Sequence, residues 1–183
     1  MVAVSIVGDG PGGLSAALFL AKNGHEVTVF GDDASAMHYA YLHNYLGIPE
    51  VSGSDFQRVA RGQTEAYGAT IDPRRVASVA TTADGVTLTT EDGATHDAAY
   101  LVLSEGKNPE LARALGLEFE DAAIVTDRDQ RTSLPRVYAV GRSTRPTRSQ
   151  AIISAGAGAA AALDILAREA GNDVQDWDTP PKS

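Results

Sequence analysis

Hydrophobic and polar positions alternate first over Ala3–Val7, where β-branched residues predict a short, buried strand. A helical pattern follows from Gly12 or Gly13 and ends at Gly24. Residues Glu26–Phe30 then repeat the strand pattern. Strand, helix and strand in this order predict a βαβ unit at the beginning of the sequence.

The pattern becomes irregular over Asp32–Gly53, a segment unusually rich in Tyr and His. A second helix is expected over Gly53–Tyr67, opened by Ser52 or Ser54 as the N-cap. The spacing places three apolar residues on one face of this helix, namely Phe56, Val59 and Ala60.

Short strands separated by turns fill the middle of the chain. The stretch "GATID" predicts one strand, and residues 76–104 predict several more, joined by Asp-Gly turns at Asp84–Gly85 and Asp92–Gly93. We expect a small antiparallel β-meander that leads into a buried strand at Tyr100–Leu103.

The last third of the chain predicts a helical turn at Leu111–Leu115, a strand at Val137–Val140 and a long Ala-rich helix at Ser149–Ala170, ending near Gly171. No repeat and no linker divides the sequence. We therefore expect a single domain over residues 1–171, followed by a loose tail over residues 172–183.

The amino-acid composition limits which kinds of site and which partners the chain is expected to have. The chain has no cysteine, and its four histidines do not fall at metal-ligand spacing, so we expect no metal site. The net charge is −9, with 15 Asp and only three Lys, a balance that resembles proteins from halophilic organisms. Ordinary acidic solubility is the alternative. An acidic chain without a broad basic face is not expected to bind nucleic acid.

We expect a cytoplasmic protein that does not insert into a membrane. The longest apolar candidate, around Leu14–Ala21, is interrupted by Ser15 and is shorter than the roughly 20 residues that a membrane helix needs. No basic leader with a cleavage site precedes the first strand.

Gly8, Gly10 and Gly13 form a G-x-G-x-x-G motif between the first strand and the first helix. In this position the first glycine allows a tight turn, the second lets the backbone approach a pyrophosphate, and the third lets helix and strand pack closely. The phosphate then lies at the positive end of the helix dipole. We expect nucleotide binding; the alternative is a glycine turn that has lost its ligand.

The acid that binds the ribose in such folds is expected about 20 residues further on, at the end of the second strand. That position is Gly31 here, and Asp32 and Asp33 follow it. Asp32 is the candidate for the ribose, and the alternative is that both aspartates are solvated turn residues.

The motifs together resemble the FAD domain of thioredoxin reductase. The opening "VGDGPGGLSAALFLAKNGHEVTVFG", the stretch "NYLGIPEVSGSDFQRVARGQTEAYGATI" and the closing "TSLPRVYAVGRSTRPTRSQAIISAGAGAAAALDI" carry the resemblance. It implies an α/β, Rossmann-like, three-layer FAD/NAD(P)-binding fold with a parallel sheet beside the meander. It also implies FAD as the cofactor.

The resemblance assigns roles to residues at both ends of the chain. The pyrophosphate is expected on the glycine loop, the adenosine beside Asp32 and Val76, and the ribityl chain and ring near the C-terminal motif. The predicted cofactor-binding residues are Gly8, Gly10, Pro11, Gly12, Gly13, Gly31, Asp32, Asn44, Val76, Gly141, Arg142, Gln150 and Ala151. No catalytic residue is assigned.

Two departures from the family pattern change the expected activity. The family inserts an NADPH domain with a Cys-x-x-Cys motif, whereas here the chain passes directly from the meander through "LSEGKNPEL" to the closing motif. Without cysteine, this chain is not expected to reduce disulfides.

The second departure is Arg142, at a position where the family carries Asp. Arginine does not accept a hydrogen bond from a ribityl hydroxyl, but it pairs well with a pyrophosphate. Arg136, Arg145 and Arg148 lie near it in sequence. The four arginines form either an anion site, for FAD phosphates or an acidic partner, or pairs with surface carboxylates.

The Ala-rich helix after Gln150 is expected to direct its N-terminus at the flavin, where the helix dipole stabilises negative charge. The alternative is a helix that serves only to pack the core.

The irregular segment contains four aromatic residues that could shield the flavin ring, anchor the core or form a homodimer surface: Tyr39, Tyr41, Tyr45 and His43.

Three functions remain open from sequence alone. The first is an FAD-dependent oxidoreductase that takes electrons from NAD(P)H or from a separate redox protein. The second is a non-catalytic flavin or nucleotide carrier, sensor or partner subunit. The third, an NAD(P)-binding protein, is disfavoured because the closing motif resembles a flavin site.

Overall fold

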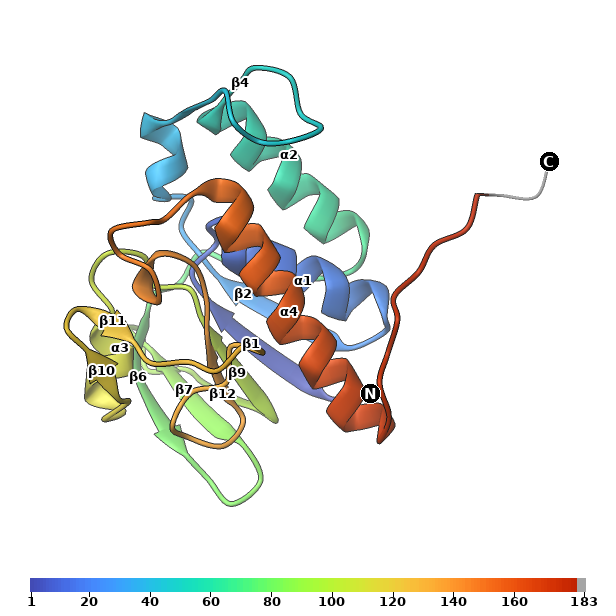
Figure 1. The fold of residues 1–183 in the computed structure, drawn as a ribbon. Coiled ribbons are helices and arrows are strands. Elements are labelled where there is room, and N and C mark those ends of the chain that lie inside the picture. Colours follow the sequence, from blue (N-terminus) through green and yellow to red (C-terminus); the bar gives the residue numbers. More distant parts are fainter. Residues whose placement is uncertain (181–183) are drawn as a thin grey trace.

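The computed structural model describes residues 1–180 and shows an α/β fold in three layers (Figure 1). The central layer is a five-stranded sheet in the order β12-β9-β1-β2-β5, and every neighbouring pair is parallel. Its strands, in chain order, are β1 (Ala3–Val7), β2 (Glu26–Phe30), β5 (Thr70–Asp72), β9 (Tyr100–Leu103) and β12 (Val137–Ala139). The predicted α/β fold with a parallel sheet is confirmed.

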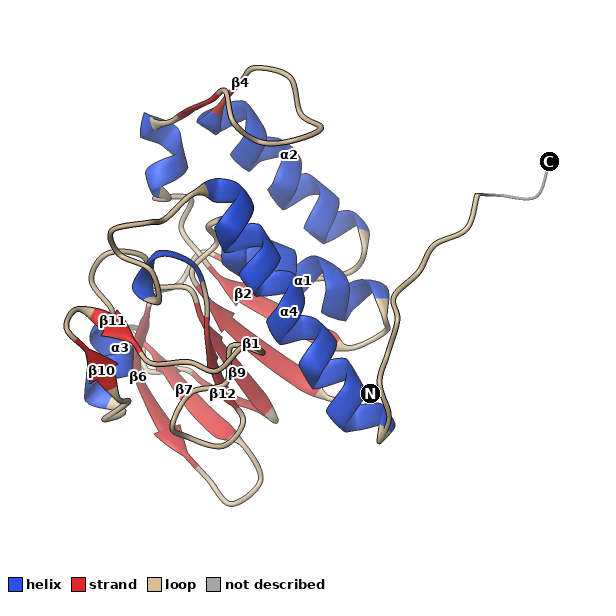
Figure 2. Ribbon diagram, viewed as in Figure 1, coloured by secondary structure: helices blue, strands red, loops and turns tan. Residues whose placement is uncertain are grey.

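Helices and the meander cover opposite faces of this sheet (Figure 2). One face packs against α1 (Pro11–Lys22) and α4 (Ala151–Ala170), with α2 (Gly53–Ala66) beside α1. The other face carries the antiparallel meander and the short α3 (Glu110–Ala114). The meander strands are β6 (Val76–Thr81), β7 (Val86–Thr90) and β8 (Thr95–Ala98).

Strand β9 shows why the central strands read as continuous apolar runs. Tyr100 and Val102 join the core cluster under α1 and α4, while Leu101 and Leu103 join the cluster under the meander. Because both faces of the parallel sheet are covered at this point, every residue of β9 is buried.

Helix α2 begins as predicted, but the side of the helix that faces inward is not the side that its apolar residues predicted. Ser52 is the N-cap, and its hydroxyl accepts the Asp55 N–H at 3.0 Å. Val59 is 55% exposed, whereas Gln57 is fully buried. Gln57 Nε2 donates to the carbonyl of Asp9 at 2.6 Å, so a polar contact with the glycine loop decides which side of α2 faces inward.

Several short elements were not predicted. The segment after β2 contains a 3₁₀ turn, η1 (Ala36–Tyr39), and a two-residue pairing of β3 (Tyr41–Leu42) with β4 (Val51–Ser52). A second small hairpin joins β10 (Phe119–Glu120) to β11 (Ala123–Ile124). Strands of two residues carry no readable periodicity.

Helix α4 starts at Ala151, two residues later than Ser149, and Gly171 ends it in the left-handed conformation with φ +72°. By length and composition alone, α4 is long and apolar enough to cross a membrane. The sequence analysis did not consider it as a membrane helix because Gly and Ala interrupt its larger apolar residues. In this fold six of its residues are buried, and Ala161 and Ile165 belong to the core.

The predicted tail over residues 172–183 has no helix or strand as far as Pro180, and residues 181–183 lie outside the described part of the chain. Two contacts hold its first half. Val174 packs against the core, and Lys22 Nζ pairs with Asp176 at 2.9 Å and with Asp178 at 2.6 Å.

Helices α1 and α4, from the two ends of the described chain, pack closely against each other. A Cβ atom on Gly158 would lie 2.0 Å from the carbonyl oxygen of Gly12, so no larger residue fits there without displacement. A Cβ on Gly12 would in turn lie 3.1 Å from Val140 and 3.2 Å from the Ser154 carbonyl. The glycines therefore bring the start of α1 beside the closing segment.

Candidate cofactor-binding site

The glycine loop lies between β1 and α1, and two of its glycines are required by close backbone contacts. Gly8 has φ +98°, and a Cβ there would lie 2.2 Å from the carbonyl oxygen of Ser104. A Cβ on Gly13 would lie 2.0 Å from the Gly8 carbonyl oxygen. A Cβ on Gly10 would meet only Ser35 Oγ, at 3.7 Å. The space beyond Gly10 is therefore open to a ligand.

That space belongs to a cleft of about 1450 Å³ along the carboxyl ends of the parallel strands. Ligands of open α/β sheets bind at this edge. Twelve of the thirteen predicted cofactor-binding residues line the cleft: Gly8, Gly10, Pro11, Gly12, Gly31, Asp32, Asn44, Val76, Gly141, Arg142, Gln150 and Ala151. Gly13 is the exception, since it lies behind the loop and donates its N–H to Ser104 Oγ at 3.2 Å.

Residues far apart in sequence meet at the end of the cleft next to α4. Asn44 Nδ2 donates to Gln150 Oε1 at 3.1 Å, across 106 positions of the chain. Gln150 is the N-cap residue of α4, and no side chain caps this helix terminus. Gln150, Ala151 and Ser154 line the cleft, so the positive end of the α4 dipole faces it.

Asp32 lies at the cleft but has an exposed side chain. Its Oδ1 accepts the N–H of Ala34 at 3.2 Å, the contact of a local Asx turn. Nothing in this arrangement distinguishes Asp32 from a solvated turn residue.

Asp9 is a buried carboxylate that the sequence analysis missed. Its side chain is 6% exposed; Oδ2 accepts the N–H of Asp33 at 3.0 Å and forms an ion pair with Arg61 of α2. Burial raises the pKa of Asp9, against the lowering influence of the Arg61 guanidinium. An acid between the first two glycines of the motif was the available signal.

Glu105, two residues after β9, is a second carboxylate that the sequence analysis missed. Its two oxygens accept the N–H groups of Leu111 at 2.8 Å and Ala112 at 3.0 Å, so it caps α3 while lining the cleft. Burial raises the pKa of Glu105, and these backbone hydrogen bonds act in the opposite direction.

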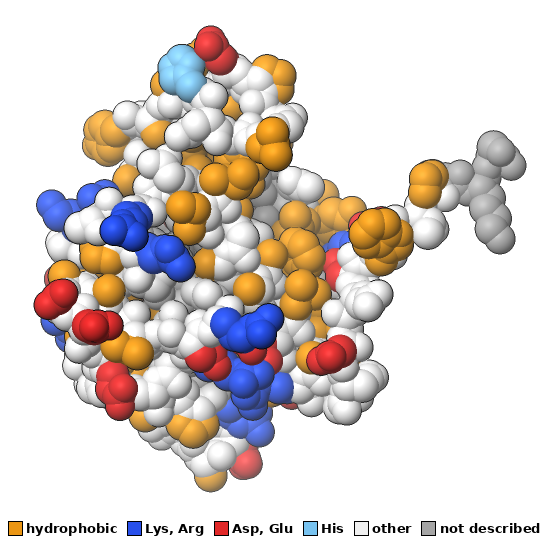
Figure 3. Space-filling model, viewed as in Figure 1, with side chains coloured by type: hydrophobic (Ala, Val, Ile, Leu, Met, Phe, Trp, Pro, Cys, Tyr) orange, Lys and Arg blue, Asp and Glu red, His pale blue; other side chains and the backbone are white. Residues whose placement is uncertain are grey.

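The four arginines of the closing segment do not form one group. Arg136 precedes β12 and lies over the Tyr100 ring at 5.3 Å, whereas Arg142 follows the other end of β12 in the turn η2 (Gly141–Ser143). Arg142, Arg145 and Arg148 are exposed, and none of them forms an ion pair within residues 1–180. Figure 3 shows basic side chains gathered over this region. Pairing with surface carboxylates is wrong for these three.

The aromatic segment divides between two surfaces. Tyr39, 94% exposed, and Tyr41 line the cleft together with His43, whose Nδ1 lies 3.1 Å from Glu50 Oε1. Tyr45 instead packs against Phe56, with ring centroids 5.4 Å apart, beside a separate apolar groove. Neither of the two tyrosines that line the cleft anchors the core.

Across residues 1–180 no group of three or more acidic or His residues has metal-site geometry.

Comparison with known proteins places this geometry in a family. The model of the pyridine nucleotide-disulphide oxidoreductases matches residues 46–159, which is more than half of the sequence. The chain belongs to this family. The matched residues exclude the glycine loop, so the assignment of the loop rests on its geometry.

The similar curated proteins are thioredoxin reductases. That of Streptomyces clavuligerus is 34% identical over 124 residues, covering 65% of this chain and 38% of the relative. That of Streptomyces coelicolor is 31% identical with the same coverage. The chain thus spans 38% of the length of these relatives.

Solved structures confirm the fold. A thioredoxin reductase from Gloeobacter violaceus superimposes with a TM-score of 0.86 at 18% identity, over 97% of this chain and 99% of that one. The atypical thioredoxin reductase TRi from Desulfovibrio vulgaris Hildenborough gives 0.80 at 20% identity, over 91% and 97%. The predicted resemblance is confirmed, and FAD, the predicted cofactor, is the cofactor of this family.

Proposed function

We propose that this thioredoxin reductase-like FAD-binding domain passes electrons through bound flavin and receives them from outside the chain. The observation that carries the proposal is the convergence of both chain ends on one cleft, with the glycine loop at one part and the N-terminus of α4 at another. Residues 1–171 act as one binding unit in this proposal.

The residues of the cleft fit FAD by shape. Pockets for drug-sized ligands occupy about 300–1000 Å³, and about 1450 Å³ suits a larger dinucleotide. Gly10 leaves room for a pyrophosphate at the N-terminus of α1, whose N-cap residue has no side chain and where the helix dipole attracts phosphate. Val76 and Arg75 line the part of the cleft proposed for the adenine.

Flavin supplies hydride and single-electron chemistry when bound, and the protein supplies position and electrostatics. The proposed contribution of α4 is its positive N-terminus, which stabilises negative charge on the adjacent ring. Asn44 and Gln150 hold each other at the same place and orient their free polar atoms along the cleft. With no cysteine in these residues, electrons do not pass to a thiol of this chain.

The binding test uses Gly10→Val, which places a side chain in the phosphate space and whose Cβ would meet only Ser35 Oγ, at 3.7 Å. We expect purified wild type to carry, or to be reconstituted with, flavin absorbing in the visible region, and Gly10→Val to lose it while keeping its thermal stability. Gly62→Ala, on the outer side of α2 with no atom within 4 Å of the new Cβ, is the matched control. Wild type that remains colourless after incubation with FAD contradicts the proposal and favours an NAD(P)-binding protein.

The source of electrons is a separate question with its own measurement. Anaerobic bleaching of the bound flavin by NADH or NADPH supports an oxidoreductase that uses a diffusing nicotinamide. A flavin that neither nicotinamide reduces, but that a separate redox protein reduces, supports an enzyme that takes its electrons from that protein.

We also propose a homodimer formed through the exposed aromatic segment. Light scattering on the same sample measures it.

A non-catalytic carrier or sensor is the second candidate, and Arg142 is the observation that favours it. Arg142 stands at the cleft where the resemblance expects an acceptor for the ribityl chain. In the carrier, flavin binds but neither nicotinamides nor redox proteins reduce it at a useful rate. Restoring a carboxylate with Arg142→Asp then changes the flavin reduction rate without removing the flavin.

A further inference from the structure

Asp9 and Gly31 fit together at the place where dinucleotide-binding folds carry their ribose acid. A Cβ atom on Gly31 would lie 2.4 Å from both Cβ and Cγ of Asp9, and 2.8 Å from Oδ2. The Asp9 carboxyl group therefore occupies the volume that a side chain at the end of β2 would take. Carboxylates at positions 9 and 31 exclude each other in this backbone.

The surrounding chain holds the Asp9 carboxylate in one orientation. Oδ2 takes the N–H of Asp33 and the Arg61 guanidinium, and Asp33 adopts φ +60°, a conformation uncommon for a residue other than glycine. From α2, Gln57 Nε2 fixes the Asp9 backbone carbonyl at 2.6 Å. Helix α2 and the turn at Asp33 thus determine where this side chain points.

One oxygen of Asp9 remains available to a ligand. Within residues 1–180, no other residue donates a hydrogen bond to Oδ1, and Asp9 lines the cleft beside Gly10 and Gly31. Asp32, the residue expected to bind the ribose, is exposed and has Oδ1 committed to the N–H of Ala34. A buried, oriented carboxylate is better prepared than an exposed one because it needs no ordering when the ligand binds.

We propose that Asp9 Oδ1 accepts a hydrogen bond from a hydroxyl of the adenosine ribose of FAD. The inference rests on the proposed function and names a residue of the same site. The carboxylate that faces the ribose then comes from the glycine loop, and Gly31, which has no side chain, leaves room for it at the end of β2. Arg61 pairs with the other oxygen, Oδ2, of the same carboxylate.

The test measures nucleotide binding by calorimetry, with ADP and 2′,3′-dideoxy-ADP as probes that differ only in the ribose hydroxyls. Hydrogen bonds to charged groups contribute enough that wild type is expected to bind ADP at least about tenfold more tightly than dideoxy-ADP. Asp9→Ala is expected to bind both probes with affinities within about threefold of each other. Asp32→Ala, the matched control, keeps the wild-type discrimination.

A second variant covers the case in which Asp9→Ala fails to fold with Arg61 unpaired. The double variant Asp9→Ala/Gly31→Asp returns a carboxylate to the same volume from the end of β2, and we expect it to regain discrimination between the probes. Regained discrimination also separates ribose recognition from a purely structural role of Asp9.

The outcomes are distinguishable from failure of the proposed function. Wild type that binds neither FAD nor ADP overturns the proposed function itself. Wild type that binds FAD but takes ADP and dideoxy-ADP equally well overturns the role of Asp9 alone. The same conclusion follows if Asp32→Ala loses discrimination while Asp9→Ala keeps it.

Discussion

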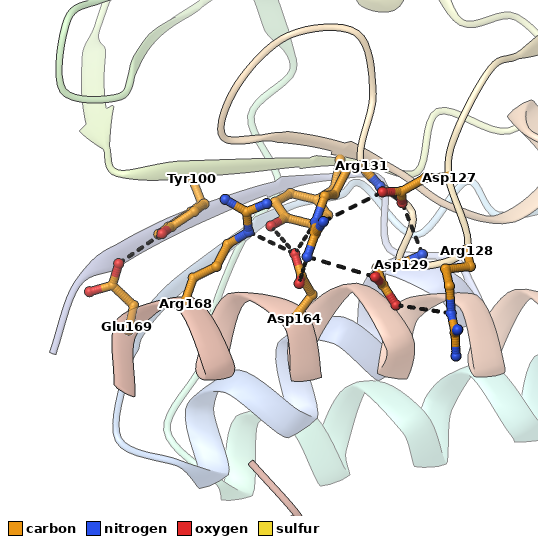
Figure 4. A network of polar contacts seen from close by, with 9 residues as sticks. Tyr100, Asp127, Arg128, Asp129, Arg131, Asp164, Arg168 and Glu169 are labelled. Carbon is orange, nitrogen blue, oxygen red and sulfur yellow. Dashed lines mark hydrogen bonds and ion pairs between the residues drawn. The ribbon is translucent and has the colours of Figure 1, made fainter. Parts of the chain in front are cut away.

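Asp164 of α4 lies at the centre of a polar network that ties α4 to the loop before β12 (Figure 4). Its side chain is 9% exposed and accepts hydrogen bonds from Arg131 Nε at 2.8 Å, Arg168 Nε at 3.0 Å and the hydroxyl of Tyr138 at 2.5 Å. Burial acts to raise the pKa of Asp164, but these donors outweigh it and lower the pKa to about 2 from the ordinary 3.8.

That difference in pKa sets the size of the predicted effect. Each pKa unit corresponds to about 1.4 kcal/mol, so the network favours the charged carboxylate by about 2 kcal/mol. Asp164→Asn removes the charge and keeps the shape. We expect its free energy of unfolding at pH 7 to fall by about 2 kcal/mol, and its Tm to fall by roughly 4–8 °C for a chain of this size.

The same carboxylate makes stability depend on pH in a defined window. Because the pKa in the folded state is lower than in the unfolded state, the stabilisation is present above 3.8 and is lost as pH falls towards 2. In this window wild type should lose about 2 kcal/mol more than Asp164→Asn. Urea unfolding of both proteins at several pH values measures the difference.

Asp129→Asn is the matched control for this prediction. Asp129 lies 3.7 Å from the same Arg131 but is 38% exposed, and such surface pairs contribute little. We expect a change of less than about 0.5 kcal/mol. Equal unfolding free energies for wild type and Asp164→Asn at pH 7, or parallel curves between pH 4 and 2, would refute the reasoning.

Three further predictions concern stability. Gly158→Ala drives a Cβ into the Gly12 carbonyl and should destabilise the fold by about 1–3 kcal/mol. Gly156→Ala, whose new Cβ has no atom within 4 Å, should instead stabilise α4 by about 0.5–1 kcal/mol. Urea unfolding of the two variants should therefore show changes of opposite sign in the free energy of unfolding. Ser52→Ala removes the α2 N-cap and should cost about 1 kcal/mol in the same assay, and no change would contradict the capping role. If the net charge of −9 reflects adaptation to salt, the Tm should rise between about 0.1 and about 2 M KCl, and a flat or falling Tm argues for ordinary acidic solubility.

Local signals predicted the parts of the fold that depend on nearby residues. The strand Tyr100–Leu103 was found to the residue because both of its faces are apolar and a covered parallel strand shows no alternation. Gly24 and Gly171 ended their helices because both take a positive φ just beyond the last turn. Each of these features is determined by residues only a few positions apart in the sequence.

The missed features depend on partners distant in sequence. The close contact between Asp9 and Gly31 appears only when their two segments, 22 positions apart, are placed together. The inward side of α2 is set by the contact of Gln57 with the glycine loop, which periodicity does not report. Arg136 and Arg142 are close in sequence, but the intervening strand β12 separates them to opposite ends of the sheet.

The Gly12–Gly158 contact has a consequence for the order of events during biosynthesis. Domains fold progressively while the ribosome extends the chain. The nucleotide loop is translated well before its wall of residues 141–154 and before the helix that packs on Gly12. Nascent chains that stop before residue 141 should therefore expose the face of α1 that packs on α4 and fail to retain flavin, so flavin loading must follow translation of residues 141–170.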